Sequence, residues 1–263
     1  MDYMHSMNHV LCNTPRMQLQ DFGRAEVQQL YNFLALNHSP NLALHVHSVL
    51  RIAINYAIDN DLIVKNPLRG VVLPKKEKYH PVFISANELQ TLLIASEYHG
   101  IYNAVLLAGY AGLRRGEVLG LTVPYVDTEK CILEICRSVE YRNGERIVSL
   151  PKSDNSYRRL LVSERFISRL LEHHDGSEYF CDYTQGVLYK RFSKCLKETG
   201  MKPMRFHDLR HTYASLLLES GEDIKNISFR LGHSSVTLTL DTYVHLNTNS
   251  QRSSADALDY IIP

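Results

Sequence analysis

The chain has 263 residues, enough for one large domain or two modest ones. Its 29 basic and 28 acidic residues nearly cancel to a net charge of +1, and this lack of a basic excess weighs against a nucleic-acid partner without excluding one. The five cysteines are odd in number and lack C-x-x-C spacing, and no apolar run is long enough to span a bilayer. A disulfide-stapled scaffold and a membrane-spanning protein are thereby excluded, and a cytoplasmic protein with reduced thiols is expected.

The first quarter of the chain predicts a small helical domain. Residues 1–20 are polar and weakly patterned, which indicates a loosely ordered segment or one poor helix. Two segments with apolar residues at helical spacing follow, 21–37 and 41–60. We therefore expect a helical domain over residues 1–74.

A proline-bounded, lysine-rich segment comes next and predicts an interdomain linker over residues 75–81. Its lysines, Lys75, Lys76 and Lys78, could rest on phosphate groups. They could equally be solvated residues of an exposed linker, and the sequence leaves both interpretations open. The remainder of the chain, residues 82–263, forms the second predicted domain.

The second domain opens with two predicted helices. A capping box, Ser-Ala-Asn-Glu, begins the first helix over 85–98, and the almost wholly apolar segment 101–111 predicts a buried second helix. The adjacent Arg114 and Arg115 then interrupt the apolar run, which a core tolerates only when the charges are paired. Glu117 can pair with Arg114, or Arg114 can bind a phosphate, and both can hold together.

Residues 131–162 change character and predict two consecutive β-hairpins. The first has its turn at Asn143-Gly144. The second has its turn at residues 153–156, followed by a strand that begins at Tyr157. Lys152 lies at the mouth of that second turn, where a long side chain could swing into a site, although a lone surface lysine is usually inert.

The last third of the chain is predicted to be helical. Two amphipathic helices come first and three shorter ones follow, and glycines stop several of them. The predicted ranges are 163–174, 184–199, 208–220, 222–231 and 235–245, with Gly200, Gly221 and Gly232 as stops.

Four side chains near the ends of the shorter helices suit attack on a phosphodiester. His207 and Arg210 are three residues apart, so they share a helix face and can reach one object together. Arginine binds phosphate oxygens bidentately, and a tyrosine such as Tyr243 can be a covalent nucleophile. The turns between the helices are expected to bring His233 to the same pocket.

These residues lie in motifs that resemble a known family. The H-x-L-R-H-T pattern at His207, the L-G-H pattern at His233 and the T-x-x-x-Y-x-H pattern around Tyr243 resemble the C-terminal signature of the tyrosine recombinases, the phage-integrase family. The G-L-R-x-x-E segment at Arg114 and the hairpin Lys152 resemble two further elements of that family. The resemblance implies six catalytic residues: Arg114, Lys152, His207, Arg210, His233 and Tyr243.

The resemblance also implies a fold. It implies a mainly α protein with a small antiparallel β-sheet (α+β). Residues 1–74 would form a helical, SAM-like core-binding domain for DNA that is incomplete if its first helix is eroded or missing. Residues 82–263 would form the catalytic domain and its C-terminal tail. Arg115 and the three linker lysines would be candidate DNA contacts, and Glu117 would support Arg114.

The implied activity is that of a site-specific DNA recombinase or integrase of a mobile element. It would cut and rejoin strands through a 3′-phosphotyrosyl intermediate without metal, ATP or cofactor. The implied partners are double-stranded DNA at a specific recombination site and further copies of the chain. Those copies would form a tetramer on DNA, with the C-terminal tail docking in trans and an accessory directionality factor as an optional partner. The resemblance implies no membrane partner and a place of action in the prokaryotic cytoplasm.

Three other interpretations compete with this one. A zinc hydrolase would use His207, His211 and His233 as ligands, but the motif is H-D-L-R-H rather than H-E-x-x-H, and an arginine between ligands repels a metal. A type IB topoisomerase uses the same chemistry but rejoins the same strand. A truncated or inactive DNA-binding module of the same family is the third alternative.

Overall fold

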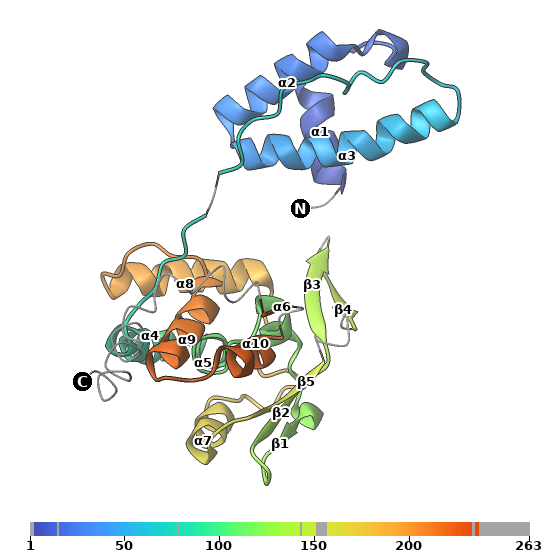
Figure 1. Ribbon diagram of the computed structural model, residues 1–263. Helices are drawn as coiled ribbons and strands as arrows, with labels where there is room; N and C mark the ends of the chain where they lie inside the picture. Colours follow the sequence, from blue (N-terminus) through green and yellow to red (C-terminus); the bar gives the residue numbers. More distant parts are fainter. Residues whose placement is uncertain are drawn as a thin grey trace, which may run out of the picture. The chain divides into compact units, whose positions relative to one another are not determined.

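The computed structural model describes residues 3–14, 16–77, 79–142, 144–150, 157–232 and 235–236. Four predicted site residues, Lys78, Lys152, His233 and Tyr243, lie outside the described residues, as does the C-terminal tail. The chain forms two compact units, Met1–His80 and Pro81–Pro263, each with its own hydrophobic core (Figure 1).

The described part of the first unit contains three α-helices and one short 3-10 turn. Both α1 and α2 pack on α3, and their apolar faces form one core. For residues 1–20 the alternatives were a loosely ordered segment and one poor helix, and a helix is present. Val10 of that helix is buried in the core of the unit. The bounds are α1 (Tyr3–Asn13), the turn η1 (Leu19–Asp21), α2 (Arg24–Asn37) and α3 (Pro40–Asp59).

The start of α3 follows from its sequence. The Ser39 hydroxyl accepts a hydrogen bond from the Leu42 N–H at 3.1 Å, and Pro40 occupies the first helical position. Two of the apolar residues used to predict this helix lie outside the core, because Ile52 and Tyr56 are 54% and 65% exposed.

The segment after α3 returns along the first unit. Gln28 of α2 exchanges two hydrogen bonds with the backbone of Val72, at 2.7 and 3.0 Å. The side chain of Asn41 donates to the carbonyl of Glu77 at 3.1 Å. The chain therefore stays hydrogen-bonded to this unit up to Glu77.

The second unit is organised around α5, whose residues Tyr102–Gly109 are all buried. The helices α4, α6 and α9 pack on it, as the almost wholly apolar sequence requires. Among the described helices, none has both the length and the hydropathy needed to cross a bilayer. The helices are α4 (Ala86–Tyr98), α5 (Tyr102–Tyr110), α6 (Arg115–Gly120), α7 (Glu164–Glu172), α8 (Gln185–Glu198), α9 (Asp208–Glu219) and α10 (Ile224–Leu231).

The predicted capping box at the start of α4 is confirmed. The Ser85 hydroxyl accepts from the Glu88 N–H at 3.3 Å, and the Glu88 carboxylate accepts from the Ser85 N–H at 2.7 Å. The short helix α6 was not predicted from the sequence. It begins directly after the G-L-R segment.

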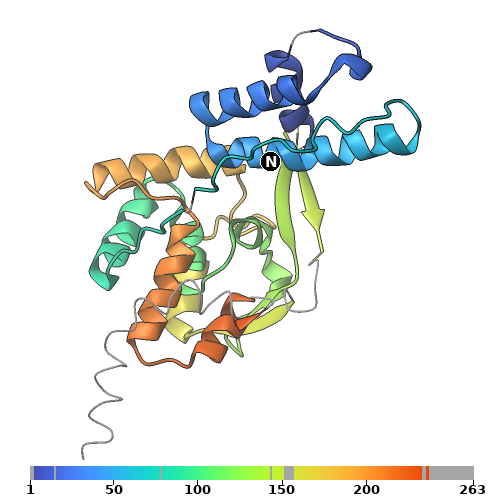
Figure 2. The same cartoon turned by 45° about the horizontal axis from the view of Figure 1, so that its top comes forward.

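Two small antiparallel sheets complete the second unit, and together with the helices they confirm the predicted mainly α fold (Figure 2). In the ribbon of β3 and β4, Arg142 pairs with Glu145, which fits the predicted two-residue turn. The other sheet has the order β1-β2-β5. The strands are β1 (Val126–Asp127), which follows a 3-10 turn η2 (Val123–Tyr125), β2 (Ile132–Ile135), β3 (Ser138–Arg142), β4 (Glu145–Ser149) and β5 (Arg158–Leu161).

The predicted second hairpin is wrong in its pairing. The strand β5 pairs with β2 and not with β4 in the described residues. The reason is the core, because Leu133 and Leu160 lie opposite each other and are 0% and 1% exposed. The strands β4 and β5 therefore belong to two different sheets.

Gly112, in the turn between α5 and α6, has no room for a side chain. Its φ of +70° is in the left-handed region, and an added Cβ would lie 2.4 Å from Cδ1 of Tyr213. The turn therefore lies directly against Tyr213 of α9, and only glycine permits that approach.

Replacing Gly112 by alanine should destabilise the second unit by about 3 kcal/mol, because the left-handed conformation costs roughly 1–2 kcal/mol and overpacking adds a similar amount. Urea unfolding would measure the loss. Gly200 is the matched control, since its φ is +68° but nothing lies within 4 Å of an added Cβ. Gly200→Ala should lose only the conformational part, and equal losses for the two variants would contradict the packing argument.

Candidate DNA cleavage site

A buried carboxylate, Glu117, lies at the centre of the predicted site. It belongs to the first turn of α6 and is 6% exposed. Arg114 precedes the helix, and its backbone N–H donates to Glu117 Oε2 at 2.8 Å while Nη1 donates to Oε1 at 2.9 Å. The Arg114–Glu117 ion pair, one of the two alternatives from the sequence, is therefore present.

A second arginine, Arg158 of β5, holds the same carboxylate from the other side. Its Nη1 donates to Oε1 of Glu117 at 3.0 Å and its Nη2 donates to Oε2 at 2.9 Å. The sequence analysis did not identify this residue. The available signal was strand alternation, because Arg158 and Leu160 share the inward face of β5 and a charge at an inward position requires a partner.

A third arginine, Arg210 of α9, also belongs to the cluster. Its Nη1 lies 4.0 Å from Oε2 of Glu117 and donates to the carbonyl of Gly112 at 2.7 Å. Its side chain is 2% exposed, whereas that of Arg114 is 36% exposed. Arg114 is therefore the guanidinium on the open side of the cluster.

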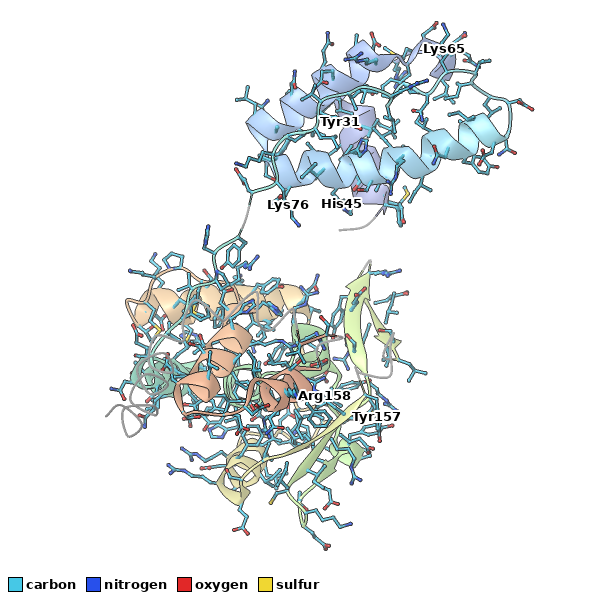
Figure 3. All side chains as sticks on the ribbon, viewed as in Figure 1. Tyr31, His45, Lys65, Lys76, Tyr157 and Arg158 are labelled. Carbon is cyan, nitrogen blue, oxygen red and sulfur yellow. The ribbon has the colours of Figure 1, made fainter. Side chains whose placement is uncertain are left out.

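The same three arginines bind the carboxyl end of α10. Carbonyls in the last turn of a helix lack helical partners and carry partial negative charge, so cations are stabilised there. Figure 3 shows Arg158 between β5 and α10, where one of these contacts is made. The donor and acceptor pairs are Arg158 Nε to Arg230 O at 2.7 Å, Arg210 Nη2 to Leu231 O at 2.5 Å and Arg114 Nη2 to Gly232 O at 2.6 Å.

The predicted helix stop at Gly232 is confirmed. Its φ of +64° is left-handed, as expected for a residue that ends a helix. His233 is the next residue, so the contact between Arg114 and the Gly232 carbonyl fixes the backbone immediately before it.

The electrostatics of Glu117 follow from these contacts. Burial by itself would raise the pKa of its carboxyl, but the hydrogen bonds and charge of Arg158 outweigh it, with help from Arg210 and Arg114. Together they lower the pKa of Glu117 to about 2. The carboxylate is therefore ionised throughout the neutral range.

His207 occupies the position just before α9. Burial lowers the pKa of its imidazole to about 4, and the neighbouring His211, Arg210 and Arg205 act in the same direction. At neutral pH the ring is uncharged and can accept a proton. The rings of His207 and His211 meet edge to face with centroids 5.0 Å apart, and no metal-binding group of three ligand side chains occurs in the described residues.

The remaining predicted residues have simpler surroundings. Lys75 and Lys76 are exposed, and Arg115 donates from Nη1 to the hydroxyl of Tyr189 on α8. The structure thus brings together Arg114, Arg210 and Glu117.

Replacing Glu117 by glutamine should lower the free energy of unfolding at neutral pH by about 3–5 kcal/mol, the usual result of removing one partner of a buried ion pair. The folded pKa lies below the ordinary value of about 4.3, so the stabilisation is complete above that value. It is lost as the pH falls towards 2. Urea unfolding should show that the difference in free energy of unfolding between the wild type and Glu117→Gln is smaller at acidic pH than at neutral pH.

Glu172→Gln is the matched control for this prediction. It removes an ion pair with Arg169 at 2.7 Å in which both side chains are about half exposed. Because water screens such pairs, its stability should change far less. A Glu117 variant no less stable than this control would show that the buried cluster does not hold the fold.

Comparison with known proteins shows the family of the chain. Residues 82–250 match the model of the phage integrase family. A XerC-like tyrosine recombinase of Caldanaerobacter subterraneus subsp. tengcongensis is 28% identical, covering 92% of this chain and 72% of that protein. The ICEBs1 integrase of Bacillus subtilis is 31% identical, covering 78% of this chain and 62% of that protein, just under two thirds of its length.

Solved structures show the same fold. The Tn1549 transposon integrase in complex with a circular intermediate DNA aligns with a TM-score of 0.75 at 18% identity, covering 97% of this chain and 92% of that one. A λ integrase dimer bound to a COC′ core site aligns with a TM-score of 0.70 at 19% identity, covering 91% and 86%. The chain belongs to the phage integrase family of site-specific tyrosine recombinases.

Proposed function

We propose that this recombinase cuts and rejoins double-stranded DNA at a specific site through a 3′-phosphotyrosine on Tyr243. The observation that carries the proposal is that Arg114 and Arg210, from distant parts of the chain, both lie against the carboxylate of Glu117. Arg210 also donates to a carbonyl at the end of α10. Two guanidiniums held in place at the end of α10 suit a pentacoordinate phosphate. The family membership supports the same assignment.

The arginines bind the scissile phosphate. A guanidinium carries five N–H donors, and Arg114 uses one Nη for Glu117 and the other for Gly232, with its side chain still 36% exposed. Arg114 therefore approaches a non-bridging oxygen of the phosphate from its exposed side, and the more deeply buried Arg210 stabilises the negative charge of the same phosphate. Preorganised donors of this kind stabilise the charge that develops in the transition state.

The cleavage step needs a base and an acid. The hydroxyl oxygen of Tyr243 attacks phosphorus, and its proton passes to the ring of His207, whose low pKa keeps the imidazole unprotonated at neutral pH. The bond from phosphorus to the 5′-oxygen breaks, and Lys152 protonates that oxygen. His233 donates a hydrogen bond to a phosphate oxygen.

Rejoining reverses these steps. The 5′-hydroxyl of a partner strand attacks the phosphotyrosine, the bond from phosphorus to Tyr243 breaks, and the tyrosine recovers its proton. The intermediate conserves the phosphodiester bond energy, so strand exchange requires no ATP, and two arginines replace a metal as the charge-stabilising group.

The working assembly is proposed to be a tetramer on two DNA duplexes. Relatives support this, because λ integrase is known as a dimer bound to a COC′ core site and as a tetramer bound to a Holliday junction. In the proposal, the first unit grips DNA as the core-binding domain, and Lys75, Lys76, Lys78 and Arg115 contact the backbone. The C-terminal tail docks on a neighbouring copy, a directionality factor is an optional partner, and the bacterial cytoplasm is the place of action.

Replacing Tyr243 by phenylalanine should abolish covalent attachment to DNA and leave DNA binding within about threefold, because only the nucleophilic oxygen is lost. The protein is incubated in EDTA with plasmid and with candidate attachment-site duplexes. Detergent then quenches the reaction, and protein joined to DNA is resolved on a denaturing gel.

The two proteins together decide the proposal. An adduct formed by the wild type and not by Tyr243→Phe establishes the nucleophile without metal. An adduct formed by the phenylalanine variant means that another residue attacks. If the wild type binds attachment-site DNA but forms no adduct, the chain is an inactive DNA-binding module.

Replacing Lys152 by alanine should slow cleavage by about 10²- to 10⁴-fold, the usual contribution of a general acid. A substrate with sulfur at the bridging 5′ position should restore the rate, because a thiolate leaves without being protonated. Single-turnover cleavage of the two substrates measures the effect. If the sulfur substrate gives the variant no recovery, Lys152 is not the acid.

A further inference from the structure

Arg158 has no role in the chemistry proposed above, yet it is almost completely buried. Its side chain is 1% exposed. It binds both oxygens of Glu117 and the carbonyl of Arg230. Desolvating a guanidinium is costly, and a buried ion pair often adds little net stability, so the role to examine for Arg158 is the geometry that it imposes on its neighbours.

The contacts of Arg158 link it to both proposed phosphate ligands, Arg114 and Arg210, and we call this hydrogen-bonded network the frame. Arg158 fixes Glu117, and Glu117 in turn orients Arg114 through two hydrogen bonds and lies 4.0 Å from Arg210. Arg158 also holds the end of α10 at Arg230. Arg210 and Arg114 hold the next two carbonyls.

Lysine could not make this frame. The three donor atoms Nε, Nη1 and Nη2 of Arg158 each serve a different acceptor oxygen, in the planar geometry of a fork. A single ammonium keeps the charge but reaches fewer of these acceptors in one plane. Charge and geometry can therefore be separated by one substitution.

We propose that Arg158 is a positioning residue for strand cleavage: it locks Glu117 and the carboxyl end of α10, and thereby sets the place of Arg114, Arg210 and the turn that leads to His233. This proposal rests on the proposed function of the site. Arg158 acts through its neighbours and does not itself touch the DNA.

The expected magnitude follows from how strongly cleavage depends on geometry. A displacement of catalytic groups by about 1 Å can cost 10²-fold in rate. Arg158→Lys should therefore slow cleavage at saturating DNA by about 10- to 100-fold. DNA affinity should stay within about threefold, because Arg158 is buried beneath the site.

The experiment uses the full chain and a nicked duplex that carries the site cleaved by the wild type, so that the released strand end diffuses away and the adduct accumulates. Cleavage rate, DNA affinity and thermal unfolding are measured for Arg158→Lys. Arg159→Lys is the matched control, since Arg159 is the neighbouring arginine on the exposed face of the same strand. The control should cleave like the wild type.

A second comparison separates positioning from support of the fold. If Arg158 acts partly through Arg114, then Arg158→Lys should slow cleavage less in the Arg114→Ala background than in the wild type, because one of the positioned ligands is already gone. A fully additive loss in a folded double variant would mean that Arg158 does not act through Arg114.

The outcomes are distinct. If the wild type forms no Tyr243-dependent adduct, the proposed function fails and the positioning role falls with it. If the wild type cleaves and folded Arg158→Lys cleaves equally fast, only the positioning role is overturned. Should the lysine variant unfold, Arg158→Met with Glu117→Gln removes both buried charges together, and wild-type cleavage by that folded pair would equally refute the proposal.

Discussion

The second unit depends on neutralising one buried negative charge. Glu117 is desolvated, and an isolated ionised carboxylate in such surroundings would be costly. Three arginines surround it, which leaves the cluster with three positive charges against one negative, a net charge of +2. The partial negative charges of the carbonyls at the end of α10 stabilise part of that excess, because each of the three arginines donates a hydrogen bond to one of them. Arg114 is the most exposed of the three arginines, so the positive charge of the cluster reaches the surface there. A chain with a net charge of only +1 therefore still presents a locally positive site.

The same interaction explains the order of the elements around it. Arg114 comes from the α5–α6 turn, Arg158 from β5 and Arg210 from α9, so the carboxylate joins three parts of the chain that are distant in sequence. The turn at Gly112 allows this because it has no side chain, and its carbonyl accepts from Arg210. Stability and the geometry of the site are therefore properties of one network, and a change in one alters the other.

The local features of the fold could be predicted from the sequence because their causes are local. The capping box at Ser85, the left-handed stop at Gly232 and the apolar stripe of α5 each depend on residues within a few positions of one another. The pairing of β5 could not be predicted in this way. A turn-like segment at 153–156 suggested a hairpin with the preceding strand, but burial of Leu160 against Leu133 decided for β2.

The sequence by itself determined the family, the mainly α fold and the residue types of the site, because motifs with fixed spacing record the chemistry that they serve. It left open whether Arg114 pairs with Glu117, and it did not identify Arg158. The tertiary structure decided both, since the three arginines converge on the carboxylate only when α6, β5 and α9 are packed together. Hydrogen bonds between residues 41 and 118 positions apart depend on that packing, and no local pattern encodes them.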